Sequence, residues 1–183
     1  KPLLSPYNMK RVLGIIPARY ASTRFPGKPL VDIQGKPMIQ WVYERCSDTF
    51  DHLLVATDDY RIINAVHAFG GEASLTAESH KSGTDRCLEA YEIVKKEREE
   101  EFDIIVNIQG DEPLVNPDQL RELIACFDIE GTEIATLIHP LANTEDPDNP
   151  DIVKVVVDNA YKSLYFSRSP IPFKRDINAK AKY

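Results

Sequence analysis

The fold is decided by a short apolar stretch near the start of the chain, Val12-Leu-Gly-Ile-Ile-Pro-Ala18. Nearly continuous apolar runs of this length are typical of strands buried on both faces of a parallel sheet. Similar runs occur at 52–58 and 103–109, and segments with helical apolar spacing lie between the three runs. This alternation predicts an α/β fold, with a Rossmann-like, mostly parallel sheet and helices on both faces.

The remaining elements are predicted from the same periodicities. Pro37 and Asp59 stand where helices begin, Gly70-Gly71 ends the second helix, and Thr84 is a candidate cap for a third, long helix. Further segments are expected as a weak strand at 72–77, a helix at 117–127, a strand at 133–141, and a hairpin formed by 152–157 and 163–167.

Composition limits the class of protein. The 183 residues, 43% of them hydrophobic, are enough for one core, so we expect one domain over 10–183, with 1–9 an extension that is natural or added for expression. A net charge of -7 argues against a nucleic-acid partner. The three cysteines are widely spaced and form no CxxC pair, which favours reduced thiols in the cytoplasm. No apolar run approaches the length of a membrane span, so no membrane insertion is expected.

A basic loop follows the first strand. Arg19, Arg24 and Lys28 lie within ten residues, with Ser22 and Gly27 between them. Small residues let backbone N–H groups approach a phosphate, and the cations neutralise it. Because ligands of parallel sheets bind beyond the carboxyl ends of the strands, the loop predicts an anion site, with a simple basic surface loop as the alternative.

Two further segments are expected at the same edge of the sheet. In Gln109-Gly110-Asp111-Glu112, the carboxylate of Asp111 could hold Mg²⁺ that also binds phosphate, although such a sequence also suits an ordinary turn. In Ser82-Gly83-Thr84, hydroxyl and N–H groups could contact a base, a ribose or a phosphate. Taken alone, this third segment is better explained as an ordinary helix cap.

These residues carry a family resemblance. The stretch Ile15-Ile-Pro-Ala-Arg-Tyr-Ala-Ser-Thr-Arg-Phe-Pro-Gly-Lys-Pro-Leu30 resembles the N-terminal signature of the CMP-Kdo synthetases (3-deoxy-manno-octulosonate cytidylyltransferases), within the sugar nucleotidyltransferase group. The likeness continues through the segments at 35–39, 55–58, 80–86, 106–113, 149–150, 153–155 and 164–168. It therefore covers nearly the whole chain, in order, and implies the nucleotide-diphospho-sugar transferase type of fold.

The resemblance also implies roles for individual residues. Arg19, Arg24 and Lys28 would hold the CTP triphosphate with help from Ser22 and Gly27. Ala18, Ser82 and Thr84 would lie near the cytidine. Asp111 would bind Mg²⁺, and with Arg19 and Lys28 would form the catalytic set. Gln109 and Arg168 would face the sugar acid, with Lys154 lining the same pocket.

The implied reaction joins CMP from CTP to Kdo and releases pyrophosphate, as a step of lipopolysaccharide biosynthesis. The resemblance further implies a homodimer in the cytoplasm. Members of the family continue past the position of Tyr183 with a second metal-binding carboxylate, so the chain is expected to lack its C-terminal portion. The alternatives are a cytidylyltransferase of the CMP-sialic acid synthetase kind, a CTP-binding module without turnover, and a purely structural domain.

Overall fold

The computed structural model describes residues 10–21, 25–142 and 145–173. The chain divides into two compact units, one ending at Glu133 and the other beginning at Ile134, and each is described by itself. The expectation of a single domain over 10–183 stays a prediction.

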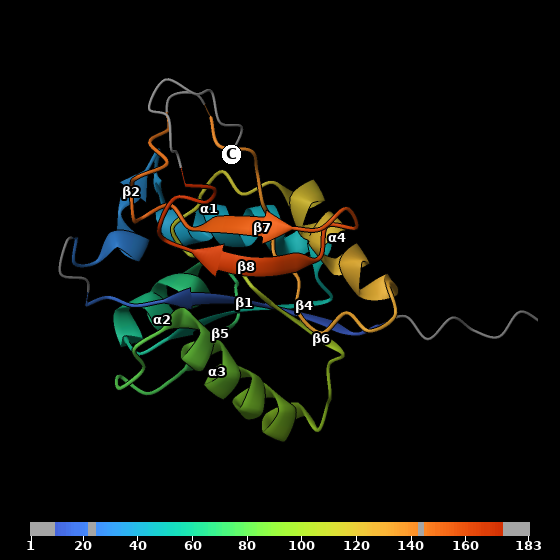
Figure 1. Cartoon of the computed structure of the whole chain (residues 1–183). Coiled ribbons are helices and arrows are strands. Elements are labelled where there is room, and N and C mark those ends of the chain that lie inside the picture. The colour runs from blue at the N-terminus through green and yellow to red at the C-terminus, as the bar shows by residue number, and fades with distance from the viewer. Residues whose placement is uncertain (1–9, 22–24, 143–144, 174–183) are drawn as a thin grey trace, which may run out of the picture. The chain divides into compact units, whose positions relative to one another are not determined.

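The first unit contains a parallel sheet of strand order β5-β4-β1-β6 (Figure 1). Its strands are β1 (Val12–Ala18), β4 (His52–Thr57), β5 (Ala73–Leu75) and β6 (Ile104–Asn107). In register, Leu13 of β1 lies beside His52 of β4, and Val12 lies beside Ile104 of β6. The chain moves outward from β1 to β4 and β5, then returns to place β6 on the other side of β1. The strand order therefore reverses between β1 and β6, which is where such sheets form a ligand crevice.

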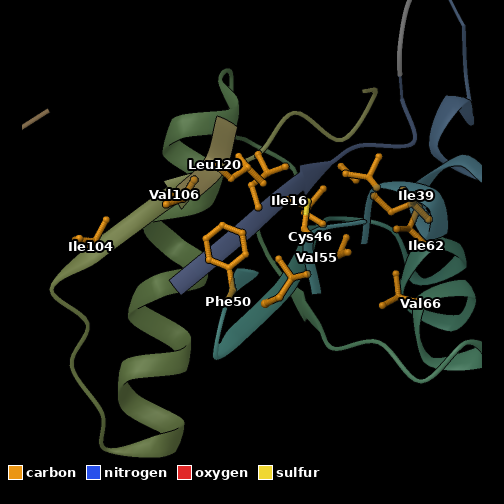
Figure 2. Close-up of a cluster of buried hydrophobic side chains, with 14 residues drawn as sticks. Ile16, Ile39, Cys46, Phe50, Val55, Ile62, Val66, Ile104, Val106 and Leu120 are labelled. Carbon is orange, nitrogen blue, oxygen red and sulfur yellow. The ribbon is translucent and has the colours of Figure 1, made fainter. Parts of the chain in front are cut away.

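Helices cover both faces of this sheet, as predicted. Residues of α1 (Met38–Cys46), α2 (Tyr60–Ala68) and α4 (Pro117–Ala125) form one apolar cluster with the sheet, whose converging side chains are shown in Figure 2. The long helix α3 (Gly83–Arg98) packs its Cys87, Ala90 and Val94 against the opposite face. Because Leu13, Ile15 and Ile16 of β1 are all fully buried, the central strand is enclosed on both sides.

Local signals account for the shorter elements and the ends of the helices. Asp59 caps α2, since its Oδ1 accepts the backbone N–H of Arg61 at 2.8 Å, and Gly70 ends that helix with a φ of 81°. The prediction of Thr84 as the cap of α3 is wrong, because Ser82 occupies the cap position. Short elements that periodicity does not reveal are η1 (Lys28–Leu30), β2 (Asp32–Ile33), β3 (Lys36–Pro37), η2 (Ser47–Thr49) and η3 (Cys126–Asp128).

The second unit contains the predicted hairpin. Strands β7 (Lys154–Val157) and β8 (Ser163–Ser167) pair antiparallel, with Lys154 beside Ser167. The strand predicted at 133–141 is wrong, because the structure assigns no strand there. A strand requires a hydrogen-bonded neighbour, and apolar alternation does not provide one; the sheets of the described residues contain no partner for this segment.

Within the described ranges, none of the helices is long and apolar enough to cross a membrane. The three cysteines are free thiols. Burial raises the pKa of Cys46 to about 11 and that of Cys87 to about 12, so both are unreactive at neutral pH.

Candidate active site

A pocket of ≈ 540 Å³ opens in the first unit where β1 and β6 end. Its polar wall contains two cations, Arg19 and Lys28, and the side chains of Gln109 and Asp111. The other lining residues are Pro17, Ala18, Phe25, Pro29, Met38 and Gly110. The pocket thus lies at the reversal of strand order, and the basic loop and the acidic turn both contribute to it, as the sequence predicts.

An ion pair spans the pocket. Lys28 Nζ lies 2.6 Å from Asp111 Oδ2, although the two residues are 83 positions apart in the chain. Both side chains stay accessible, at 41% and 53% exposure. A pair this exposed contributes about 0–1 kcal/mol, so a ligand that offers phosphate to the lysine and a cation to the carboxylate can replace it at little cost.

The backbone around Lys28 is set by a stacked tyrosine. Gly27 has a φ of 73°, a conformation that favours glycine, and its N–H donates to the carbonyl of Tyr20 at 2.9 Å. A Cβ at Gly27 would lie 3.1 Å from the Tyr20 ring. On that ring stacks the guanidinium of Arg61, 3.3 Å from the centroid, and Asp59 binds the same guanidinium. Helix α2 therefore anchors the base of the basic loop.

Two glycines bring their segments against the tip of β1. A Cβ at Gly110 would lie 2.8 Å from the backbone oxygen of Pro17, closer than real Cβ atoms approach, so only glycine fits there. A Cβ at Gly83 would lie 3.2 Å from Pro17 Cγ. The acidic turn and the start of α3 thus both pack against the same proline, which gathers all three predicted segments at the end of β1.

The start of α3 combines an exposed surface with a firm cap. Ser82 Oγ accepts the backbone N–H of Asp85 at 3.1 Å and donates to Asp85 Oδ2 at 2.7 Å. Ser82 and Thr84 are both exposed. Their side chains face solvent at the edge of the sheet where the strands end, so both are accessible to a ligand.

The predicted site residues fall into three groups. Ala18, Arg19, Lys28, Gln109 and Asp111 line one pocket, and Gly27 adjoins it. Ser82 and Thr84 lie on the segment that packs on Pro17. Ser22 and Arg24 lie outside the described residues.

Arg168 belongs to the second unit. It is exposed, and its Nη1 donates to the carbonyl of Pro150 at 2.6 Å. Its own carbonyl accepts from Lys154 Nζ at 2.7 Å. Lys154 is 7% exposed and also donates to the carbonyls of Asn149 and Ile152. All three donors of this ammonium are used within the unit, so Lys154 acts here as a brace for the backbone.

The side chains of the pocket suit a magnesium ion that is held largely by the phosphates of a bound substrate. Across the described part of the chain, no group of three or more His, Cys, Asp or Glu side chains could hold a metal. Mg²⁺ is often bound by one or two carboxylates together with substrate phosphates and waters. The exposed carboxylate of Asp111, beside two cations that would hold those phosphates, fits this mode of binding.

Sequence reasoning missed two features of the site. Phe25, Pro29 and Met38 form an apolar wall of the pocket, and only the fold brings Met38 of α1 to it. A buried ion pair between Arg86 and Asp58 stands behind the start of α3. The spacing of Ser82 and Asp85, typical of a capping box, could have identified the cap.

Comparisons with known proteins agree with this arrangement. The model of the cytidylyltransferase family matches residues 13–183. The 3-deoxy-manno-octulosonate cytidylyltransferase of Parabacteroides distasonis is 53% identical over 171 residues, covering 91% of this chain and 66% of that protein. The protein of the same name from Syntrophobacter fumaroxidans is also 53% identical, covering 93% and 68%. The chain thus spans about two thirds of the length of these relatives.

A solved structure also resembles this chain closely. CMP:2-keto-3-deoxy-manno-octonic acid synthetase complexed with CTP superposes with a TM-score of 0.83 and 46% identity, over 95% of this chain and 70% of that one. The fold is shared by a cytidylyltransferase from Leptospira borgpetersenii. That structure is 22% identical in sequence and superposes with a TM-score of 0.56, over 67% of this chain and 51% of that one. The predicted α/β nucleotide-diphospho-sugar transferase fold is confirmed, and the chain belongs to the cytidylyltransferase family.

Proposed function

We propose that this chain transfers CMP from CTP to 3-deoxy-D-manno-octulosonate (Kdo), giving CMP-Kdo and pyrophosphate. The observation that carries the proposal is the meeting of Lys28 and Asp111 across the pocket at the reversal of strand order. Family membership and the likeness to a synthetase complexed with CTP support the choice of nucleotide. The names of the relatives support the choice of sugar.

The nucleotide would lie along the end of β1. Arg19 and Lys28 would bind the triphosphate, with Gly27 allowing the backbone to come close, and Ser22 and Arg24 completing that loop. Ala18, Ser82 and Thr84 would contact the cytidine. The pocket gathers two cations at one edge of the sheet, so the groups that neutralise the triphosphate are already close together before CTP binds.

Mg²⁺ would be held by Asp111 together with phosphate oxygens. When bound, the ion supplies positive charge that offsets the charge of the phosphates. Lys28, released from Asp111, would then turn to the phosphates. The carboxylate and the ammonium that neutralise each other in the free protein would each take a partner of opposite charge from the substrate complex.

The reaction is a displacement at the α-phosphorus. The anomeric hydroxyl oxygen of Kdo forms a bond to that phosphorus, the bond from the phosphorus to the oxygen bridging to the β-phosphate breaks, and the hydroxyl proton passes to solvent water. The residues of the chain contribute mainly by holding both substrates in line and by neutralising the leaving pyrophosphate, which Arg19 and Lys28 are suited to do.

Gln109, which lines the pocket of the first unit, would contact the sugar acid. Arg168 is a residue of the second unit, and its proposed role in binding a carboxylate rests on its own chemistry. The guanidinium of Arg168 is suited to a bidentate pair with a carboxylate. Lys154 and Pro150 fix the backbone and one nitrogen of Arg168 within the second unit. We also propose that the active protein is a cytoplasmic homodimer and that its product serves lipopolysaccharide biosynthesis.

The test is pyrophosphate release from CTP and Mg²⁺ with Kdo, with sialic acid and with no sugar. This chain and any longer product of the same gene are assayed side by side. Release with Kdo alone is expected. Release with sialic acid alone would move the assignment to a CMP-sialic acid synthetase, and CTP binding without release from either protein would identify a binding module.

A further inference from the structure

A buried arginine joins the ends of three elements beside the candidate site. Arg86, in the first turn of α3, is only 4% exposed. Its Nη2 donates to Asp58 Oδ2 at 2.7 Å, and its Nη1 donates to Thr76 Oγ1 at 2.5 Å. Asp58 directly follows β4, and Thr76 directly follows β5.

The geometry of the guanidinium makes this junction specific. Its planar fork holds two acceptors in fixed directions, which a flexible ammonium does not. The backbone N–H of Thr76 also donates to the carbonyl of Thr57 at 2.8 Å, so the two strand ends are tied to each other as well as to α3. A buried charge is costly to leave unpaired, so the three groups are expected to stay together.

The exposed segment next to Arg86 is fixed from both sides. Asp85, whose backbone N–H donates to the cap residue Ser82, directly precedes Arg86. Gly83 packs on Pro17 at the end of β1. Ser82 and Thr84 therefore sit on a short stretch whose one side faces solvent and whose other side is anchored to β1, β4 and β5. The same end of α3 lies at the edge of the sheet where β1 ends (Figure 1).

We propose that Arg86 is a positioning residue, and that recognition of the cytosine base depends on the Asp58–Arg86–Thr76 network. This inference rests on the proposed function. Cytosine differs from uracil in carrying an amino donor where uracil has a carbonyl acceptor. A hydrogen-bonding site rejects the wrong base only if its polar atoms are held in place. The network holds the segment of Ser82 and Thr84 in that way.

The phosphate-binding cations provide an internal contrast. Arg19 and Lys28 come from the loop after β1, and any nucleoside triphosphate meets them equally. Loosening α3 is therefore expected to alter the preference for CTP over UTP, whereas weakening the basic loop is expected to alter the affinity for both. The ratio of the two affinities separates a positioning effect from a general loss of binding.

The experiment compares Thr76→Val with Thr76→Ser. Valine keeps the shape and removes the oxygen that accepts from Arg86, while serine keeps the oxygen. Dissociation constants for CTP and UTP are measured by calorimetry with Mg²⁺ and no sugar. We expect Thr76→Val to lower the preference for CTP about tenfold, with Thr76→Ser close to the wild type. Asp58→Asn should act in the same direction as Thr76→Val.

Lys28→Ala is the matched control, expected to weaken both nucleotides and keep their ratio. Circular dichroism establishes which variants are folded. An unchanged ratio in folded Thr76→Val and Asp58→Asn would overturn the positioning role while leaving the proposed function intact. A wild-type chain that binds neither nucleotide would overturn both.

Discussion

Two ion pairs of nearly equal length lie at the same edge of the sheet. Lys28 and Asp111 are 2.6 Å apart, and Arg86 and Asp58 are 2.7 Å apart. The first pair is 41% and 53% exposed, whereas the second is 4% and 13% exposed. The distances do not distinguish the two pairs, but their burial does. The exposed pair can break when a ligand binds, whereas breaking the buried pair would leave a charge unpaired in the interior.

This difference divides the site by task. In the proposed function, the exposed pair would keep two opposite charges available for phosphate and metal, with little effect on stability. The buried pair fixes the backbone that carries Ser82 and Thr84. Variants of the first pair are therefore expected to change activity with little change in stability. Variants of the second pair are expected to lower stability and, through the segment of Ser82 and Thr84, to alter the preference between nucleotides.

The largest effect is expected for Asp111→Asn. Loss of the carboxylate charge should lower kcat/KM about 10³-fold, because Asp111 is the one carboxylate among the described residues that line the pocket and is the proposed ligand of Mg²⁺. The free energy of unfolding should change by less than about 0.5 kcal/mol. Pyrophosphate release and urea denaturation measure the two quantities. Full turnover at saturating Mg²⁺ would remove Asp111 from the mechanism.

Next in size is the loss of stability in Arg86→Met. The substitution leaves the Asp58 carboxylate without its partner in a largely buried position, so the free energy of unfolding should fall by about 3 kcal/mol. Arg121→Met is the control, because Arg121 pairs with Asp118 on the surface and should cost less than about 0.5 kcal/mol. Equal losses in the two variants would show that burial does not distinguish these pairs.

Lys28→Ala is expected to act on nucleotide binding. Removing one charged hydrogen bond to phosphate should raise KM for CTP about 10- to 100-fold, with a small change in KM for Kdo. Initial rates at varied CTP and fixed Kdo measure it. An unchanged dependence on CTP would mean that Lys28 does not contact the triphosphate.

Cys87 offers a reporter of the buried region. It follows Arg86 directly, is 4% exposed, and burial raises its pKa to about 12. Asp58→Asn should accelerate labelling of Cys87 by a thiol reagent about tenfold or more, because α3 opens locally more often. Cys46, buried in α1, is the internal control, and mass spectrometry distinguishes the two sites. Equal acceleration at both cysteines would indicate global unfolding instead.

The smallest effect concerns the loop that leads into α3. Glu89 accepts the backbone N–H of Ala77 at 2.9 Å and pairs with His80, and these bonds lower the pKa of its carboxyl below the ordinary 4.5. A lowered folded-state pKa stabilises the fold above the ordinary value, and this contribution is lost as pH falls through the folded-state pKa. Glu89→Gln should cost under about 1 kcal/mol at pH 7. Denaturation at descending pH should show the wild type and the variant converging below 4.5, and a constant gap would contradict the assignment.

The sequence predicted the parts of the fold that depend on local patterns. The apolar runs of β1, β4 and β6 and the cap at Asp59 are local signals, and all are confirmed. The strand expected at 133–141 failed because strand formation depends on a distant partner. β6 is more exposed than predicted, since Ile105 is 40% exposed on the edge strand.

The site was predictable where charge was concentrated in sequence, as at Arg19 and Lys28. Arg86 was not, because an arginine in a Ser-Gly-Thr-Asp-Arg segment resembles a solvated residue until tertiary structure buries it. The same holds for Met38, which only the packing of α1 brings to the pocket. Long-range contacts of this kind leave no local periodicity.

The proposed transfer of CMP to Kdo is tested most directly by mass spectrometry, which detects CMP-Kdo after incubation of the wild type or Asp111→Asn with CTP, Mg²⁺ and Kdo. We expect the product from the wild type and almost none from the variant, with both proteins equally stable. Equal product from both proteins, or none from a wild type that binds CTP, would contradict it.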